Sequence, residues 1–296
     1  MALASFISYL SLEKNYSVHT VSAYEKDIQE FALFCSDQYT LGSIDDVDYT
    51  IIRSWIINLV DRNIANRTIN RKMASLKAYY KFLQNIERID ASPLAKHKAL
   101  KTSKKIEVPF SESEMQEILS QIPFKNDFEG TRDKLIIELL YTTGIRRSEL
   151  INLRLKDLDM TGRTLKVLGK RNKERIVPLL PSTLVLVTAY FEQRSMLNQD
   201  TEVDHIFLTA AGNKIYETLV YRIINGYFSL VSSKVKKSPH ILRHTFATHL
   251  LNKGADLNSV KELLGHSSLA STQVYTHNSI AELKKIHSLA HPRSKE

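Results

Sequence analysis

Cysteine, long apolar runs and several common catalytic motifs are missing from this sequence of 296 residues. The single cysteine, Cys35, excludes an internal disulfide framework and a multi-cysteine zinc module, and it is typical of a protein in a reducing compartment. No stretch approaches the roughly 20 apolar residues that span a bilayer, and no basic segment at the N-terminus leads into an apolar run. We therefore expect a cytoplasmic protein that does not enter a membrane.

The sequence also has no Gly-X-Ser-X-Gly elbow, Walker loop, dinucleotide fingerprint, internal repeat or low-complexity tract. Its histidine-rich run, His240, His244, His249 and His266, raises a zinc site as an alternative. The run has no His-Glu-X-X-His arrangement and no evident carboxylate ligand. We therefore predict that the protein uses no metal and no cofactor, and that His244 and His249 serve packing or helix capping.

Acidic residues are outnumbered, which leaves a net charge of +9 and a pI near 9.4. This excess favours an anionic partner, although charge also serves solubility alone. The length suits two domains better than one core. Segment 96–108 is polar, basic and without helical periodicity, so we predict domains at 1–95 and 109–296 joined by a linker. The linker could follow a phosphate backbone or be a solvated tether.

The N-terminal domain is expected to be all helix, and 66–85 is its most informative segment. Asn66 is a plausible N-cap. Apolar residues recur at intervals of three and four and form one stripe: Ile69, Met73, Leu76, Tyr80 and Leu83. No acid occurs from Arg62 to Gln84, so the opposite face is basic. We predict that this face and the linker contact DNA, the alternative being a solvated surface. The predicted DNA-binding residues are Arg67, Arg71, Lys77, Lys81, Lys101, Lys104 and Lys105.

Several boundary signals organise the C-terminal domain. Ser111 and Glu114 form a capping box, and an apolar helix over 134–141 ends at Thr143-Gly144, because Gly144 can adopt the left-handed conformation. Segments 164–168 and 175–177 read as a hairpin. Ser238-Pro239-His240 begins a helix, with Ser238 as N-cap and proline in the first position. Asp256 caps a further helix over 257–264, which ends at Gly265.

Six residues of this domain suit one chemistry, the exchange of a phosphodiester for a phosphotyrosine. They are Arg146, Lys170, His240, Arg243, His266 and Tyr275. Arginine forks match phosphate oxygens, fixed positive charge suits the charge that develops on phosphorus, and a phenol nucleophile needs a neighbouring base. Each residue has an ordinary explanation when taken alone. Arg146 could simply pair with Glu149, a loop lysine is usually surface, and Tyr275 could be a packing residue.

The sequence contexts are more specific than the residue types. They are Thr143-Gly144-Ile145-Arg146-Arg147-Ser148-Glu149-Leu150, Gly169-Lys170, His240-Ile241-Leu242-Arg243-His244, Leu264-Gly265-His266 and Tyr275. In this order and spacing the chain resembles the tyrosine recombinase/integrase family, and within it the Xer-type (XerC/XerD-like) bacterial site-specific recombinases. The resemblance implies a mainly α fold. It comprises an N-terminal helical bundle, a SAM-like core-binding domain, and a mostly helical α+β catalytic domain with a small antiparallel sheet.

The resemblance also implies the role of each candidate. Tyr275 attacks the scissile phosphate to give a 3′-phosphotyrosine, Arg146 and Arg243 hold the non-bridging oxygens, and Glu149 supports them. His240 accepts and returns the tyrosine proton, and His266 hydrogen-bonds the phosphate. Lys170 protonates the leaving 5′-oxygen. The family often has Gly-Lys-Gly at this turn, whereas this chain has Gly169-Lys170-Arg171, which leaves Lys173 as an alternative.

For the whole protein, the resemblance implies double-stranded DNA as partner and a homo- or heterotetramer on paired sites. A second Xer recombinase and the FtsK translocase are possible further partners. The expected function is resolution of chromosome dimers at a dif-like site, in chromosome partition and cell division near the nucleoid. The alternatives are a mobile-element integrase or transposase, a type IB topoisomerase and a non-catalytic DNA-binding regulator. Segment 279–290 is predicted to form one more helix, capped by Ser279, with an apolar stripe of Ile280, Leu283, Ile286 and Leu289. In the family the corresponding segment docks on a neighbouring protomer, the alternative being that this helix packs on its own domain.

Overall fold

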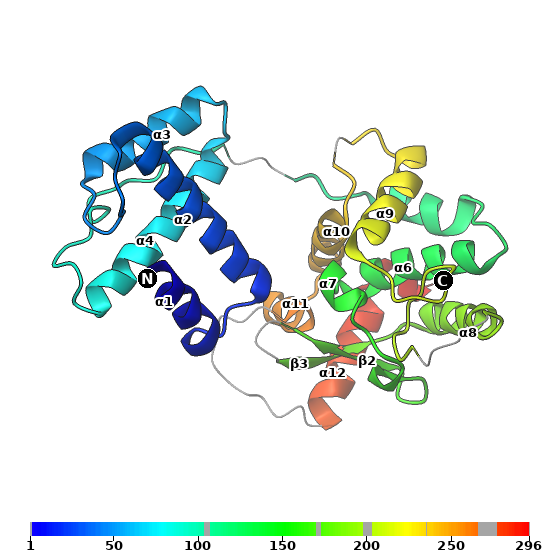
Figure 1. The fold of residues 1–296 in the computed structure, drawn as a ribbon. Helices are drawn as coiled ribbons and strands as arrows, with labels where there is room; N and C mark the ends of the chain where they lie inside the picture. Colours follow the sequence, from blue (N-terminus) through cyan, green and yellow to red (C-terminus); the bar gives the residue numbers. More distant parts are fainter. Residues whose placement is uncertain are drawn as a thin grey trace. The chain divides into compact units, whose positions relative to one another are not determined.

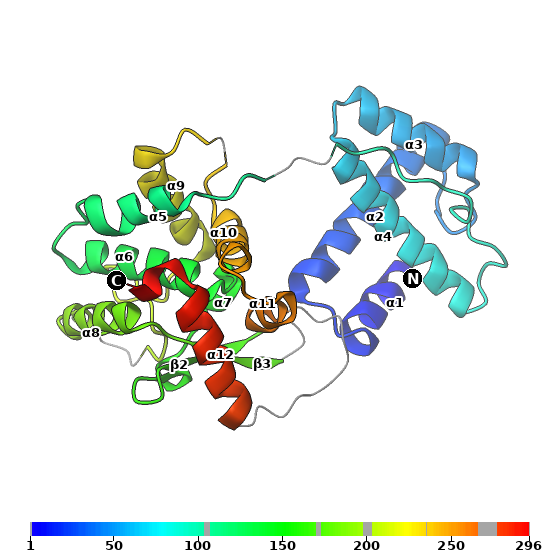
Figure 2. The same cartoon turned by 180° about the vertical axis from the view of Figure 1, so that it is seen from behind.

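The computed structural model describes most of the chain, and its elements can be followed in Figure 1 and, from behind, in Figure 2. The described residues are 2–103, 107–169, 173–197, 203–234, 236–265 and 277–295, with the backbone alone for 277–283 and 295. The chain divides into two compact units, Met1–Lys105 and Ile106–Glu296. Their boundary falls within the segment 96–108 that the sequence indicates as a linker. None of the described helices is both long and apolar enough to cross a bilayer.

The N-terminal unit is a bundle of helices. Its elements are α1 (Ala2–Ser8), the π-helical turn η1 (Tyr9–Glu13), α2 (Val18–Tyr39), α3 (Tyr49–Asp61) and α4 (Asn66–Asn85). Side chains satisfy free backbone N–H groups where two of these helices begin. Ser17 accepts from the amide of Thr20 at α2, and Asp48 accepts from the amide of Ile51 at α3.

Helix α4 packs against α1, α2 and α3. All five residues of its predicted apolar stripe are buried, which confirms the 3.6-residue pattern. They join a core that includes Phe31 of α2 and Trp55 of α3. Burial of each large side chain contributes about 1.5–3 kcal/mol before the entropy of ordering is subtracted. The predicted cap of α4 is wrong by one residue, because Ala65 is the N-cap and offers no side-chain oxygen.

Asn66 has a different task, because its side chain reaches the segment that follows the bundle. Its amide donates to the carbonyl of Lys101 at 2.9 Å. One turn further on, Asn70 both donates to the carbonyl of Leu100 and accepts from its amide, each at 2.8 Å. The beginning of the 96–108 segment therefore runs along α4 and is bound to it by three hydrogen bonds.

The C-terminal unit is mostly helical with one small sheet, as the sequence predicts. Its helices and helical turns are α5 (Glu112–Gln116), η2 (Glu117–Gln121), α6 (Phe128–Thr143), α7 (Arg147–Leu150), η3 (Leu155–Asp157), α8 (Pro181–Ser195), α9 (Glu217–Val231), α10 (Pro239–Asn252), α11 (Leu257–Leu264), α12 (His277–Ala290) and η5 (Pro292–Lys295). The capping box of Ser111 and Glu114 opens α5 as predicted. Ser238 is the N-cap of α10, and Asp256 caps α11.

The sheet contains β1 (Leu158–Asp159), β2 (Thr164–Leu168) and β3 (Glu174–Pro178) in antiparallel order. Strands β2 and β3 form the predicted hairpin, and the amide of Gly169 closes it by donating to the carbonyl of Lys173 at 2.8 Å. Leu165 pairs with Val177, and both side chains are buried. The sheet thus has one face in the core.

Helix α6 crosses the middle of this unit and packs against α8, α9 and α10. It begins at Phe128, six residues before the apolar segment that predicts it, because Asp127 caps it and its polar first turns bury Arg132 against Glu129 and Asp133. Its end is as predicted. Gly144 has φ +61°, and a Cβ there would lie 2.4 Å from a ring carbon of Phe246. Glycine is therefore required on both conformational and steric grounds.

Helix α12 packs on its own unit, against α10, α11 and β3 (Figure 2). It begins at His277, two residues before the predicted start, so Ser279 is not its cap. Of the predicted apolar stripe, Leu289 is exposed and Ile286 is half-buried, while Ile280 and Leu283 lie outside the described side chains, so docking of this stripe on a neighbouring protomer stays a prediction. Its C-terminal end is held on the unit partly by two buried histidines, His287 of α12 and His291 just after it. His287 lies 2.6 Å from the carbonyl of Thr142, and His291 lies 3.3 Å from that of Tyr141.

Candidate active site

The described part of the candidate site is built where α6, α7, α10 and α11 meet (Figure 1). Arg243 of α10 is buried, and its guanidinium donates to two backbone carbonyls from distant parts of the chain. Nη1 donates to Gly144 at 2.5 Å, and Nη2 donates to Leu264 at 2.7 Å. Arg243 therefore fixes the turn after α6 to the end of α11. Each terminal nitrogen keeps a second hydrogen, so the same fork can still bind an anion.

Arg146 follows this turn and is the N-cap of α7, so the predicted stop at Gly144 does place it at the start of a new helix. Glu149 holds it at two points. One carboxylate oxygen accepts from the Arg146 backbone amide, and the other accepts from its Nη1, both at 2.7 Å. The ion pair considered from the sequence is thus present. The side chain of Arg146 remains 39% exposed, so a ligand can still reach its guanidinium.

Arg175 is a member of this cluster that the sequence reading missed. It lies on β3 and is buried. Both of its terminal nitrogens donate to the carboxylate of Glu149, at 3.0 and 2.8 Å. A signal was available in the strand pattern. Positions 175 and 177 share the inward face of β3, and a charged residue at an inward position indicates a buried partner of opposite charge.

The electrostatics of the cluster favour an anion. Burial and the nearby Arg146 guanidinium lower the pKa of Arg243 to about 10, although Glu149 opposes this shift, so Arg243 is charged at neutral pH. Burial acts to raise the pKa of Glu149, but hydrogen bonds and charge from Arg175, with those from Arg146, hold it below its ordinary value. In the described part of the site, three guanidinium groups therefore surround one ionised carboxylate. The excess positive charge, partly out of water, suits a phosphate.

His240 occupies the second position of α10, as predicted, and its side chain is exposed. It lies 3.5 Å from the carboxylate of Glu107, which also accepts from Lys236 at 2.7 Å. That hydrogen bond from Lys236 is the main cause of a lowered pKa of Glu107. The imidazole is therefore accessible, while Arg243 one turn later points into the unit.

Three of the six predicted catalytic residues, Lys170, His266 and Tyr275, lie outside the described residues. The elements beside them are described. Gly169 precedes Lys170 at the end of β2, and Gly265 ends α11 with φ +64° directly before His266. Helix α12 begins two residues after Tyr275.

The remaining histidines of α10 take no part in this cluster. His249 is buried between the Tyr141 hydroxyl and the Phe110 carbonyl, each at 2.9 Å, which confirms that it is a packing residue. The same prediction is wrong for His244, which is exposed. Within the described ranges, no group of three or more histidine, cysteine or acidic residues is placed to hold a metal ion.

The basic face of α4 is exposed at Arg67, Arg71, Lys77 and Lys81. Acidic residues of α2 partly offset the positive charge of this face. Arg71 forms an ion pair with the buried Asp27 at 2.5 Å, and the buried Lys72 contacts Asp27 and Glu30. Lys101 is exposed, whereas Lys104 and Lys105 lie outside the described residues.

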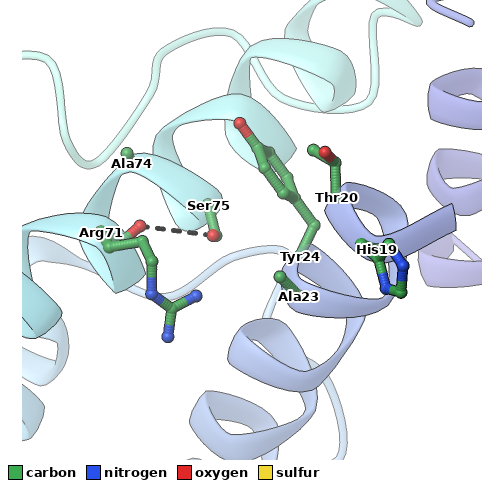
Figure 3. A pocket seen from close by; sticks show the side chains of 7 residues that line it. All are labelled: His19, Thr20, Ala23, Tyr24, Arg71, Ala74 and Ser75. Carbon is green, nitrogen blue, oxygen red and sulfur yellow. Dashed lines mark hydrogen bonds between the residues drawn. The ribbon is translucent and has the colours of Figure 1, made fainter. Parts of the chain in front are cut away.

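A cleft of about 330 Å³ lies between α2 and α4 at this face (Figure 3). It is lined by His19, Thr20, Ala23, Tyr24, Arg71, Ala74 and Ser75. Two of these, His19 and Thr20, come from the first turn of α2. Hydrogen-bonding groups of α2 therefore adjoin one cation of α4, Arg71.

Comparison with known proteins gives matches over nearly the whole chain. Residues 110–282 match the model of the phage integrase family, and residues 3–85 match that of the phage integrase N-terminal SAM-like domain. The chain is 38% identical over 315 residues to tyrosine recombinase XerC of Chlorobaculum parvum, covering 98% of this chain and 94% of that protein. It is 39% identical over 298 residues to tyrosine recombinase XerC of Oceanobacillus iheyensis, covering 98% and 95%.

Solved structures with a similar fold include DNA complexes. XerH recombinase bound to a palindromic difH substrate, in a post-cleavage complex, aligns with a TM-score of 0.71 at 20% identity, covering 97% of this chain and 84% of that one. The Tn1549 transposon integrase in complex with circular intermediate DNA aligns with a TM-score of 0.69 at 21% identity, covering 95% and 98%. At these identities the likeness concerns the fold.

Proposed function

The chain belongs to the phage integrase family and is a tyrosine-type site-specific DNA recombinase, and from this premise we propose that it cuts and rejoins DNA through Tyr275. The phenolic oxygen attacks the scissile phosphate, the bond to the 5′-oxygen breaks, and a 3′-phosphotyrosine and a free 5′-hydroxyl are formed. Attack by a 5′-hydroxyl reverses the step and releases the tyrosine. The phosphodiester energy is retained in the covalent intermediate, so the exchange has no need of ATP.

The observation that carries this proposal is the guanidinium cluster of Arg146 and Arg243. Both side chains are fixed before substrate arrives, Arg146 by Glu149 and Arg243 by two carbonyls. A preorganised positive site stabilises the additional negative charge of a pentacoordinate phosphorus without reorganisation at the moment of reaction. We assign these two residues to the non-bridging oxygens and Glu149 to their support.

The proton transfers are assigned to the remaining candidates. His240 is exposed at the start of α10, where the free amides of the helix also favour phosphate. In the proposal it accepts the tyrosine proton and returns it on religation, while His266 hydrogen-bonds the phosphate. Lys170, which follows the described end of β2, protonates the leaving 5′-oxygen.

The first prediction is that Tyr275→Phe abolishes cleavage and leaves DNA affinity within about twofold, because only one hydroxyl is lost. The measurement is covalent protein–DNA complex formed on a nicked suicide substrate that carries the recombination site. Tyr221→Phe, an exposed tyrosine of α9, is the matched control and should form the complex like the wild type. A covalent adduct that persists in Tyr275→Phe would remove this residue from the role.

We further propose that DNA also contacts the N-terminal unit, through the exposed cations of α4 and the start of the linker, Lys101 included. Asn66 and Asn70 bind the linker to α4, so the two basic segments adjoin each other. The set extends to Lys104 and Lys105 by sequence continuity. This extends direct phosphate contact beyond the catalytic unit.

The biological role that we propose is resolution of chromosome dimers at a dif-like site, by four protomers on two DNA sites. The support is the similarity to relatives named tyrosine recombinase XerC at 38–39% identity. A second recombinase and activation by the FtsK translocase are part of this proposal. Mapping the sites at which wild-type protein is covalently trapped on its own chromosome tests it. A single dif-like position supports dimer resolution, whereas the ends of a mobile element would replace this role by integration or transposition.

A further inference from the structure

Arg175 has no role in the mechanism above, yet it is one of the most constrained side chains near the site. It lies on β3 opposite Val167, within the hairpin whose turn contains Lys170. Its side chain is 5% exposed, and all three guanidinium nitrogens donate hydrogen bonds. Both terminal nitrogens are directed at the carboxylate of Glu149, so the described contacts of this guanidinium are all within the protein. We therefore look for its effect on the reaction in these neighbours.

Those neighbours belong to two other segments of the site. The terminal nitrogens bind the two carboxylate oxygens of Glu149, which in turn hold Arg146. The third nitrogen, Nε, donates to the carbonyl of Leu263 at 3.0 Å, next to the Leu264 carbonyl that Arg243 binds. One guanidinium therefore connects the hairpin, the start of α7 and the end of α11.

Arg175 also packs against two glycines, each of which directly precedes a predicted catalytic residue. A Cβ on Gly265, which directly precedes His266, would lie 3.0 Å from Cδ of Arg175. A Cβ on Gly169, which directly precedes Lys170, would lie 3.6 Å from its Nη1. The side chain thus packs against the chain at both points.

The charge balance shows what Arg175 contributes to Arg146. Glu149 is buried and receives hydrogen bonds from both arginines. If Arg175 were neutral, Arg146 would be the one cation left in hydrogen-bond contact with Glu149 among the described contacts. A buried carboxylate binds its remaining cation closely. The positive charge of Arg146 would then be offset by Glu149 and would act less on a phosphate.

We propose that Arg175 is a positioning residue whose charge balances Glu149, so that Arg146 retains its positive charge for the scissile phosphate. This inference rests on the proposed role of Arg146. It assigns the carboxylate of Glu149 mainly to Arg175, and it makes Arg175 necessary for cleavage although the residue does not touch DNA.

The test is single-turnover cleavage of a nicked suicide substrate by Arg175→Gln, Glu149→Gln and the double variant. We expect Arg175→Gln to cleave about tenfold or more slowly, because removal of one partner from a buried charged pair is costly, while its DNA affinity stays within about threefold. The double variant should recover part of the lost rate, since it removes the carboxylate that would otherwise neutralise Arg146, while the glutamine side-chain oxygen can still accept from the Arg146 amide. Lys166→Gln, which removes an exposed cation of β2, is the matched control and should cleave normally.

A second substrate separates an electrostatic effect from a general loss of structure. In a methylphosphonate, a methyl group replaces one non-bridging oxygen and the scissile group is neutral. The ratio of wild-type to Arg175→Gln rates should be smaller on this substrate, because less positive charge is required. Melting temperatures and DNA affinities of all variants are measured in parallel. Arg175→Lys, which keeps the charge without the fork, should fall between the wild type and Arg175→Gln.

Two results would overturn the inference. One is an Arg175→Gln variant that cleaves like the wild type. The other is a defect of equal size on both substrates that Glu149→Gln does not correct, which would make Arg175 a folding residue only. Neither result affects the proposed function, which fails instead if the wild type forms no covalent complex or if Tyr275→Phe forms one.

Discussion

At the scale of single residues, the contacts of Arg243 show why a catalytic arginine can be buried without an acidic partner of its own. Two backbone carbonyls, those of Gly144 and Leu264, receive its hydrogen bonds. Carbonyl dipoles stabilise the guanidinium but do not cancel its charge, so the charge is still available to an anion. Arg146 differs, because a carboxylate holds it, and this difference is the reason that a third arginine is needed in the cluster.

The residue types of the site could be predicted from the sequence, but their partners could not. Arg146, Glu149 and Arg243 are recognisable from short motifs, and the pairing of Arg146 with Glu149 follows from their spacing. The carbonyl partners of Arg243 lie 99 and 21 residues away in the chain. Such contacts depend on how α6 and α11 end and how they pack, which no local pattern contains.

A second prediction at this scale concerns Lys170, whose proposed role is that of general acid. If it protonates the 5′-oxygen, a bridging sulfur at that position, which is a far better leaving group, should restore cleavage to Lys170→Ala. The same substrate should not restore cleavage to Arg243→Ala, because that residue acts on the non-bridging oxygens. Cleavage rates on the oxygen and sulfur substrates are the measurement.

Lys173→Ala is the matched control for this experiment, since Lys173 is an exposed lysine of the same hairpin. We expect this variant to cleave the ordinary substrate at nearly the wild-type rate. If sulfur rescued Lys173→Ala instead, the role of general acid would move to Lys173. Rescue of Lys170→Ala and Arg243→Ala to the same degree, or of neither, would count against the assignment.

At the scale of elements, the sequence located helices well where caps and stripes agree and less well elsewhere. The start of α10 and both boundaries of α11 follow from Ser238, Asp256 and Gly265. The start of α6 was missed because its first turns are polar and gain their burial from ion pairs. The contacts of α12 with its own unit were not predicted, because hydrophobic periodicity gives no weight to histidine, which can be buried when its nitrogens bind carbonyls.

These buried histidines make the docking of α12 dependent on pH. Burial lowers the pKa of His287 to about 4, while the Thr142 carbonyl opposes this shift; the pKa of His291 is also lowered by burial and by nearby His287 and His249. The unfolded histidine, with a pKa of about 6.5, binds a proton at a higher pH than the folded one. The contribution of the neutral, buried histidine to the free energy of unfolding is therefore complete above pH 6.5 and is lost as the pH falls toward 4. For His287 the loss at pH 5 is about 2 kcal/mol.

We therefore predict that His287→Gln flattens the dependence of melting temperature on pH. Glutamine can still donate to the Thr142 carbonyl but cannot acquire charge. Between pH 7 and pH 5 the wild type should lose about 4–8 °C more than the variant, given its size. The exposed His244→Gln is the control and should follow the wild type. Parallel curves for wild type and His287→Gln, measured by calorimetry, would contradict the prediction.

At the scale of the whole molecule, the division into two units was accessible from the sequence because composition changes abruptly near residue 100. What the sequence could not give was the neighbourhood of the basic face of α4. Asp27 lies 44 residues before Arg71 and is buried beneath it, so the two meet only in the folded bundle. Arg71 is therefore the cation of this face with the least charge available to DNA, and Arg67, Lys77 and Lys81 are the better candidates.

The last prediction follows from this difference and concerns how the N-terminal unit contributes to binding. Replacing Arg67, Lys77 and Lys81 together by alanine should weaken DNA binding and reduce the slope of log affinity against log salt concentration by up to about three, because each phosphate contact contributes about 0.9. Adding Arg71→Ala should change the slope little. Cleavage at saturating DNA should remain near the wild-type rate, since the guanidinium cluster lies in the other unit.

Fluorescence anisotropy over a range of salt concentrations measures the slope. The matched control replaces Lys14, Lys26 and Arg53, which are exposed cations of the same unit outside α4. If this control lowers the slope as much as the α4 variant does, the unit attracts DNA through its overall charge and α4 is not a specific contact. If neither variant changes the slope, the basic face of α4 is a solvated surface. Loss of a phosphate contact reduces the number of counterions released on binding, and this would lower the slope.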